Sequence, residues 1–88
     1  MNIIFSKTAC EQYIDWQKKD KKILKKINDL IKDISRNGVL EGIGKPEKLK
    51  HFRRDLYSRR ITSEHRLVYN IDKDNNLIIY ACMGHYMD

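Results

Sequence analysis

Apolar residues in the first half of the chain recur every three or four positions, which is the spacing of one face of an α-helix. Ser6 is placed to cap a helix over residues 7–18, and Asp20 to cap a second helix that ends at Gly38. The two segments predict a helix hairpin whose apolar faces need a cover. The apolar stripe of the first helix comprises Ala9, Cys10, Tyr13 and Trp16 or Gln17. The stripe of the second comprises Ile23, Leu24, Ile27, Leu30, Ile31 and Ile34.

After a glycine-containing loop over residues 39–46, the apolar period shortens to that of β-strands. Short turns between the last four strands favour antiparallel pairing. The predicted fold class is α+β, with the order β-α-α-β-β-β-β and the helix hairpin packed on one face of an antiparallel sheet. Residues 1–88 would form a single domain, and the last strand, apolar on both faces, would be central. The predicted strands cover residues 2–5, 47–50, 56–62, 65–72 and 77–83.

Alternation along the strands separates a core face from a second face that points away from the helices. Leu67 and Tyr69 are two positions apart and suit the core face of the strand. Arg66, which directly precedes Leu67, has the opposite parity and therefore points away from the helices. Arg59 and Arg60 are neighbours on the previous strand and face opposite ways, so at least one of them joins Arg66. We therefore expect function on the face away from the helices.

Positive charge is concentrated in one quarter of the chain. The net charge is +6, from 18 Lys and Arg against 12 Asp and Glu. Residues 45–66 hold eight of the cations and three carboxylates, so 8 − 3 = +5 of that charge lies there. Such a patch is typical of proteins that bind nucleic acid, and its plainer explanation is a solvated basic surface.

Several classes of protein fit the sequence poorly. No apolar run approaches the ~20 residues that a membrane helix needs, and the first residues lack the features of a signal peptide. A cytoplasmic protein is therefore expected, in which Cys10 and Cys82 stay thiols and serve as packing groups. The histidines and cysteines show no zinc-ligand spacing, so neither metal nor cofactor is predicted.

The remaining polar residues suit one kind of RNA chemistry. Cleavage through a ribose 2′-hydroxyl needs a base for that proton, an acid for the departing 5′-oxygen and cations for the phosphorane. Glu, His and Arg supply these roles. Alternation does not place Glu47, because the apolar Leu49 shares its parity, and a histidine so near a chain end is usually a surface residue. The residues alone thus indicate a basic RNA-binding α+β domain with catalysis left open.

Five stretches together give a specific resemblance that spans nearly the whole chain from Tyr13 onward. The sequence resembles the YoeB-type toxins of the RelE superfamily, from bacterial type II toxin–antitoxin systems. This resemblance implies a RelE-like, microbial ribonuclease-like fold. The stretches are residues 18–26, GKPEKLKH at 44–51, SRRIT at 58–62, EHRLVY at 64–69, and the terminal Ala81-Cys82 and His85-Tyr86.

The resemblance implies a role for each matching residue. Glu47 of the KPE motif would be the general base, Arg66 would stabilise the phosphorane, and His85 would be the general acid. Tyr86 would position the scissile nucleotide or stack on a base. The products would be a cyclic phosphate or 3′-phosphate and a free 5′-hydroxyl. The residues expected to hold RNA phosphates are Lys50, Arg59 and Arg60.

The resemblance also implies partners. Toxins of this family cut mRNA in the A site of the bacterial ribosome and are silenced by a YefM-like antitoxin. Whether the free toxin is a monomer or a homodimer is left open. Two departures from the family pattern are the extension through Met87 and Asp88 and the single ring of Tyr57, where an aromatic pair often occurs. His65 shares the parity of the core residues, which favours a structural role. The competing hypothesis is a non-catalytic nucleic-acid-binding module or an inactivated toxin, and the complete set of candidate catalytic residues favours the enzyme.

Overall fold

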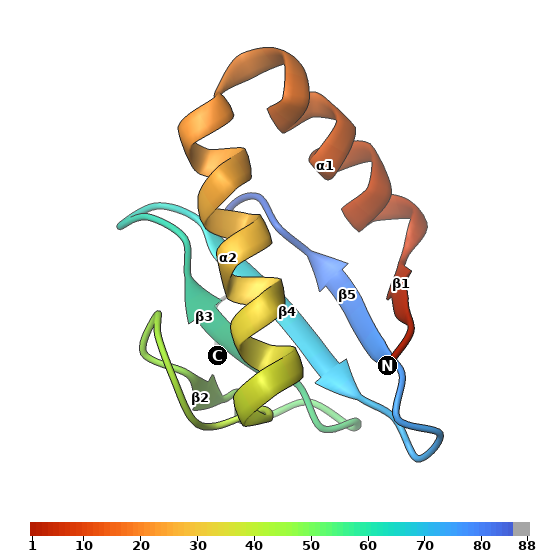
Figure 1. The fold of residues 1–88 in the computed structure, drawn as a ribbon. Helices are drawn as coiled ribbons and strands as arrows, with labels where there is room; N and C mark the ends of the chain where they lie inside the picture. The colour runs from red at the N-terminus through yellow and green to blue at the C-terminus, as the bar shows by residue number, and fades with distance from the viewer. Residues whose placement is uncertain (86–88) are drawn as a thin grey trace.

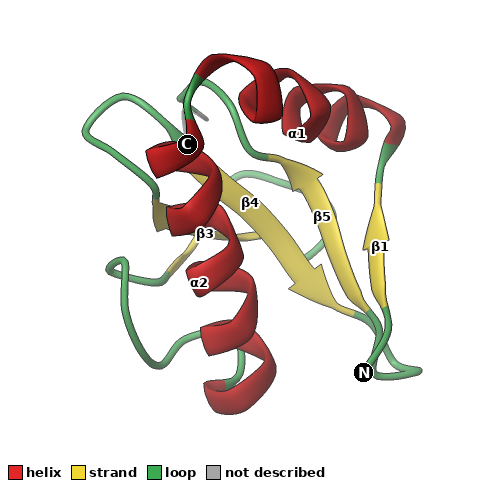
Figure 2. Ribbon diagram, turned by 45° about the horizontal axis from the view of Figure 1, so that its top comes forward, coloured by secondary structure: helices red, strands yellow, loops and turns green. Residues whose placement is uncertain are grey.

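A computed structural model describes residues 1–85 as two helices packed on one face of a five-stranded sheet (Figures 1 and 2). This architecture confirms the predicted α+β class and order of elements. The helices are α1 (Lys7–Lys19) and α2 (Lys21–Asn37). The strands are β1 (Ile3–Phe5), β2 (Glu47–Lys48), β3 (Tyr57–Arg60), β4 (Arg66–Ile71) and β5 (Leu77–Ala81).

The predicted caps fix the helix boundaries. The Ser6 hydroxyl accepts the backbone N–H of Ala9 at 3.0 Å, and the Asp20 carboxylate accepts two N–H groups of the first turn of α2. At the other end of α2, Gly38 has φ +86°, where a side chain would be strained, and its N–H donates to the carbonyl of Ile34. Neither helix of the described part of the chain is long and apolar enough to cross a bilayer.

The sheet is mixed, with strand order β1-β5-β4-β3-β2. Strands β2 to β5 pair antiparallel as predicted, and β5 is internal. The prediction of a wholly antiparallel sheet was wrong for β1, which pairs parallel to β5. The turn rule applies to consecutive strands, whereas β1 pairs with β5 only after the chain has passed through both helices and strands β2 to β4. The N–H of Ser6 continues this pairing by donating to the carbonyl of Ile79.

The main core lies between the helices and the sheet. Trp16 is buried there, and its indole N–H donates to the carbonyl of Cys82. Burial raises the pKa of the Cys82 thiol to about 12, as suits a packing group. Cys10, also predicted to pack, is exposed instead. The helix stripe therefore runs through Ala9 and Trp16 and leaves Cys10 at its margin.

A second, smaller apolar cluster covers part of the opposite face of the sheet, which we call the outer face. The loop after β2 folds back over this face, and the N–H of Leu49 donates to the carbonyl of Leu56. This cluster explains why Leu49 shares the parity of Glu47: both lie on the outer face, one covered and one exposed. Its buried members are Leu49, Leu56, Val68 and Ala81.

Candidate active site

Strand register places three of the predicted site residues on the outer face. Glu47 is paired with Ser58, and Arg60 with Arg66. Residues opposite each other in a sheet point to the same side, and positions two apart on a strand do likewise. Ser58 alternates with Arg59, whose side chain reaches α2 on the helix side. The side chains of Glu47, Arg60 and Arg66 therefore share the outer face.

These three side chains lie within reach of one anion. Glu47 is diagonal to Arg60, a relation of roughly 7–8 Å that long side chains can span. Arg60 and Arg66 are directly opposite, with β-carbons about 5 Å apart. Glu47 and Arg60 are exposed, and Arg66 is half-buried. A phosphodiester lying across β2, β3 and β4 could meet all three groups.

His85 is adjacent to the same group of residues. The backbone N–H of Arg66 donates to the carbonyl of Gly84 at 2.9 Å, so the residue that follows Gly84 leaves the sheet beside Arg66. His85 is exposed. The Arg66 guanidinium donates through Nη1 to the carbonyl of Thr62 at 3.0 Å, which holds one branch of its fork. The structure thus places Glu47 and Arg66 on the outer face and the backbone of His85 beside Arg66, and Tyr86 falls outside the described residues.

The segment that carries His85 is anchored to α1 and to His65. The N–H of Gly84 donates to His65 Nδ1 at 2.9 Å. The His65 ring in turn meets Trp16 edge-on, with centroids 4.8 Å apart. On the helix side, the N–H of Cys82 donates to the amide oxygen of Gln12 at 2.7 Å. His65 therefore has the structural role that its parity favours, and that role is to support the segment leading to His85.

The charges of this group favour an anionic ligand. Arg60 and Arg66 face each other across the strands, and like charges directly opposite destabilise a sheet. Within residues 1–85, none of Glu47, Arg60 and Arg66 forms an ion pair. Two arginines paired across the strands without a carboxylate partner among residues 1–85 present forked donors of the kind that bind phosphate oxygens.

Arg59 does not belong to this surface, so its predicted role in phosphate binding was wrong. Its side chain is fully buried on the helix side of the sheet. A guanidinium has five N–H donors, and all five are used within the protein. Nε donates to the Tyr69 hydroxyl, Nη1 to the Asp33 carboxylate and the carbonyl of Ile43, and Nη2 to two more loop carbonyls. No donor remains for RNA.

The contacts of Arg59 with Asp33, Tyr69 and residues 38–43, which we call the Arg59 network, hold the loop that leads into β2. Asp33 also accepts the N–H of Ile43, and the Arg59 guanidinium keeps the pKa of this carboxyl below its ordinary value. Burial raises the pKa of Tyr69, whose hydroxyl donates to the loop carbonyl of Val39. Gly42, at φ +112°, lies so close that an added β-carbon would sit 1.8 Å from the Asp33 carboxylate. The loop therefore approaches α2 as only glycine permits.

The same loop is connected to the outer face. The carbonyl of Gly44 accepts the backbone N–H of Arg60 at 2.7 Å, and Glu47 begins β2 three residues later. The Arg59 network thus fixes the approach of the chain to Glu47 from behind the sheet. Neither Asp33 nor its link to Arg59 was predicted, because one polar helix residue among many gives no signal of a partner 26 positions away.

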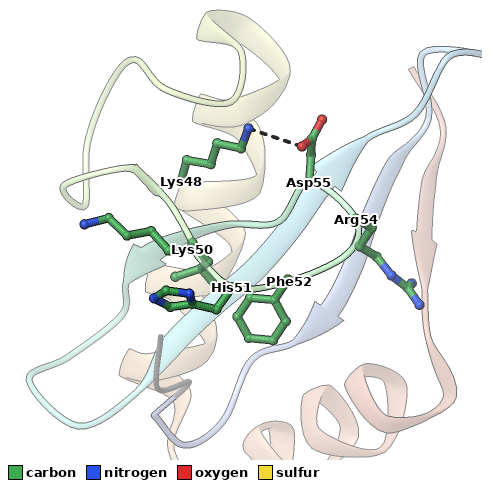
Figure 3. Close-up of a pocket in the computed structure, with 7 residues that line it drawn as sticks. Lys48, Lys50, His51, Phe52, Arg54 and Asp55 are labelled. Atoms are coloured by element: carbon green, nitrogen blue, oxygen red, sulfur yellow. Dashed lines mark ion pairs between the residues drawn. The ribbon is translucent and has the colours of Figure 1, made fainter.

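Beyond β2, the loop over residues 48–55 forms an open pocket of about 450 Å³ (Figure 3). Lys50, predicted to hold phosphate, lies in its wall. The sequence interpretation counted Arg54 of the same pocket only as one cation of the basic stretch 45–66, and it did not identify Phe52, since no motif includes either residue. Among the described residues, no group of three or more His, Cys, Asp or Glu is arranged to hold a metal ion.

Comparison with known families gives a match over most of the chain. The model of the YoeB-like toxin of bacterial type II toxin–antitoxin systems matches residues 5–86. The chain belongs to this family. It is therefore a toxin of a type II toxin–antitoxin system, as its motifs predicted.

Individual relatives agree with this assignment. The toxin is 52% identical over 86 residues to the toxin YoeB of Escherichia coli K12, covering 98% of this chain and 100% of the relative. It is 58% identical to a YoeB from Staphylococcus aureus solved as a dimer, with 98% of both chains covered and a TM-score of 0.92. An archaeal RelE in complex with RelB, from Pyrococcus horikoshii, is only 18% identical, yet its TM-score of 0.72 over 94% of this chain and 92% of that chain shows the same RelE-like fold.

Proposed function

We propose that this toxin is a metal-independent endoribonuclease that cleaves mRNA on the ribosome by activating a ribose 2′-hydroxyl. The observation that carries the proposal is the register of the sheet, which gathers Glu47 and the pair Arg60–Arg66 on the outer face beside the residue that precedes His85. A carboxylate next to two guanidiniums, none of them in an ion pair within residues 1–85, suits a substrate that carries both a transferable proton and a negative phosphate.

The proposed reaction is a transfer within the substrate. Glu47 accepts the 2′-hydroxyl proton as the 2′-oxygen attacks phosphorus. The bond from phosphorus to the 5′-oxygen breaks, and protonated His85 gives its proton to that oxygen. The products are a 2′,3′-cyclic phosphate and a free 5′-hydroxyl, and solvent returns both residues to their starting states. Glu47 accepts the proton that the 2′-hydroxyl loses, and His85 supplies the proton that the 5′-oxygen gains, so the reaction as written uses no metal.

Arg66 is the group proposed to stabilise the phosphorane. One branch of its fork is held by the carbonyl of Thr62, which leaves the other branch for a phosphate oxygen. Arg60 lies opposite and would bind a second oxygen or the neighbouring phosphate. Lys50, on the loop beyond β2, would extend this contact along the backbone, and Tyr86 would position the scissile nucleotide.

The proposed partners follow from charge and from relatives. A YoeB of Staphylococcus aureus, 57% identical to this chain with a TM-score of 0.89, was solved in complex with YefM. We propose a YefM-like antitoxin for this toxin, with an acidic segment that neutralises the patch around Arg60 and Arg66. The dimeric relative supports a homodimer of the free toxin, and the proposed substrate is mRNA in the ribosomal A site.

The test uses ribosomes that carry a defined message. Glu47→Gln should slow cleavage by ~10²-fold or more, and Arg66→Ala by roughly 10²–10³-fold. Glu11→Gln, an exposed carboxylate of α1, is the matched control and should cut at the wild-type rate. A message with a 2′-O-methyl group at the scissile ribose should stay intact. Cleavage of that message would refute the role of the 2′-hydroxyl, and full activity of Glu47→Gln would remove Glu47 as the base.

The same experiment separates the enzyme from a protein that only binds RNA. A non-catalytic module would occupy the ribosome and inhibit translation while the message stayed whole. If the message is intact after translation has stopped, the toxin is an RNA-binding protein and not a nuclease.

A further inference from the structure

The pocket over residues 48–55 lies outside the group of Glu47, Arg66 and His85, and the proposed reaction gives most of it no role. Its loop crosses the outer face because Leu49 and Leu56 are buried against Val68 and Ala81. The pocket begins at Lys48, the residue that follows Glu47, so a ligand bound in it would lie beside the candidate active site. Its volume of about 450 Å³ falls within the range of ~300–1,000 Å³ that is usual for small-ligand sites.

The charges of the pocket favour an anion. Its one carboxylate, Asp55, is paired with Lys48 at 3.2 Å, which leaves Lys50 and Arg54 without a carboxylate partner in the described chain. The Arg54 guanidinium lies over the Tyr80 ring, 5.1 Å from its centroid. This cation–π contact holds the guanidinium near one orientation, so less side-chain freedom would be lost on binding.

The pocket also presents flat apolar surface. Phe52 is 39% exposed, which is unusual for so large an apolar side chain in a loop rich in charge. Figure 3 shows its ring with Lys50 and His51 on one side and Arg54 on the other. The backbone of His51 is in the left-handed region, at φ +65°, which a residue with a side chain rarely adopts. The loop is thus held in an uncommon conformation that displays rings and cations together.

Cations interleaved with an exposed ring are typical of sites for single-stranded nucleic acid, where bases stack on aromatic side chains and cations follow the backbone. A duplex offers no unstacked base to such a ring. We propose that this pocket is a subsite for one nucleotide of single-stranded RNA, with its base stacked on Phe52 and its phosphates held by Lys50 and Arg54. The proposal rests on RNA as the substrate of the toxin, and it assigns the pocket to binding and not to catalysis.

Binding to RNA that cannot be cut tests the subsite separately from the nuclease. The probe is a short, fluorescein-labelled 2′-O-methyl oligoribonucleotide, followed by anisotropy. Phe52→Ala should weaken binding by ~5- to 150-fold, the range for loss of one stacked base, and Phe52→Tyr should restore it. Ile14→Ala, which removes an exposed apolar side chain from α1, should have no effect.

Salt dependence tests the phosphate contact. The affinity for RNA falls as salt rises, and Arg54→Gln should make the slope of log K against log salt less negative by about 0.7, the value for one phosphate of a single strand. The control Arg36→Gln, at the end of α2, should leave the slope unchanged. Thermal unfolding of each variant confirms that the fold is intact. Wild-type affinity in Phe52→Ala and an unchanged slope in Arg54→Gln would overturn the subsite, whether or not the toxin cleaves message.

The second arm identifies the source of the nucleotide. Ribosomes without message are bound to the same variants in place of the oligonucleotide. Weaker binding of Phe52→Ala to the oligonucleotide alone supports a nucleotide of the message, and weaker binding to empty ribosomes supports ribosomal RNA in the same subsite. If Phe52-dependent binding persists while message on ribosomes is never cut, the nuclease fails and the subsite stands.

Discussion

Arg59 and Arg60 are neighbours in β3, have the same side chain, and meet opposite environments. Arg59 is fully buried, and its five N–H groups donate to the Asp33 carboxylate, the Tyr69 hydroxyl and loop carbonyls. Arg60 is exposed, and it is paired with Arg66 across β3 and β4. One residue of strand alternation thus separates a cation that holds the fold together from a cation that is available to a ligand.

This difference shows where the protein accepts an electrostatic cost. On the helix side, every charge and hydrogen-bond donor of Arg59 has a partner, as burial requires. On the outer face, two cations stand opposite each other with no carboxylate partner in the described chain. Sites prepared for a ligand commonly leave such conflicts, because the ligand supplies the missing charge.

The largest effect should follow loss of Arg59. Arg59→Ala would leave the Asp33 carboxylate and several loop carbonyls without donors, and should lower the free energy of unfolding by about 3–5 kcal/mol. Arg59→Lys should not recover it, because an ammonium lacks the planar fork. Urea unfolding measures both variants, with the exposed Arg36→Ala as control. A loss under ~0.5 kcal/mol, the range of surface substitutions, would contradict the structural role of the Arg59 network.

Acid should reveal the same network through Asp33. The Arg59 guanidinium lowers the pKa of Asp33 in the folded protein, so this carboxylate stabilises the fold at pH values above its unfolded pKa. That contribution is lost as pH falls through the lower, folded pKa. The melting temperature of the wild type should therefore fall more steeply between about pH 5 and about pH 2 than that of Asp33→Asn.

The control for acid unfolding is Asp72→Asn. Hydrogen bonds from Asn76 also lower the pKa of Asp72. Asp72→Asn should therefore remove the part of the pH dependence of stability that comes from Asp72 and keep the part that comes from Asp33. Parallel curves for the wild type and Asp33→Asn would show that the ion pair with Arg59 contributes nothing to stability.

A smaller effect is expected at His65, which supports the segment leading to His85. His65→Phe keeps a ring against Trp16 and removes the acceptor for the N–H of Gly84, at a cost of about 1–3 kcal/mol. His65→Asn keeps an acceptor near the position of Nδ1 and loses the ring contact. Cleavage on ribosomes should fall further in the Phe variant than in the Asn variant. Equal rates in the two would mean that the hydrogen bond does not position His85.

The smallest effect, and opposite in sign, is expected at Arg60. Arg60→Thr removes one of two like charges across β3 and β4, and should stabilise the fold by roughly 0.2–1 kcal/mol. The same variant should bind the oligonucleotide more weakly, with a salt slope lower by about 0.7. Gain in stability with loss of affinity would sharpen the contrast with Arg59. Loss of both would make Arg60 a structural residue.

Local rules recovered much of the fold. The caps at Ser6 and Asp20, the end of α2 at Gly38 and the alternation of Leu67 and Tyr69 with Arg66 all depend on nearby residues, and each agrees with the structure. The direction of β1 could not be predicted, because it depends on where the helix hairpin returns the chain.

The site was harder to predict for the same reason. Alternation showed that Arg59 and Arg60 differ, but the pairing of Arg60 with Arg66 is a matter of register between strands. The position of Glu47 was obscured by Leu49, since no pattern showed that a loop would cover part of the outer face. The Arg59 network joins α2 to β3 through contacts that are remote in sequence and carry no motif.

The parallel pairing of β1 with β5 has a consequence for how the toxin is made. Ile3 lies opposite Leu77, and the Ser6 hydroxyl that caps α1 also donates to the carbonyl of Tyr80. Contacts so distant in sequence form late. In a nascent chain, β1 therefore cannot pair with β5, and the Trp16 indole cannot donate to the carbonyl of Cys82, until residues 77–82 have emerged from the exit tunnel. The five-stranded sheet cannot be completed while the ribosome that synthesises the chain still holds this last strand.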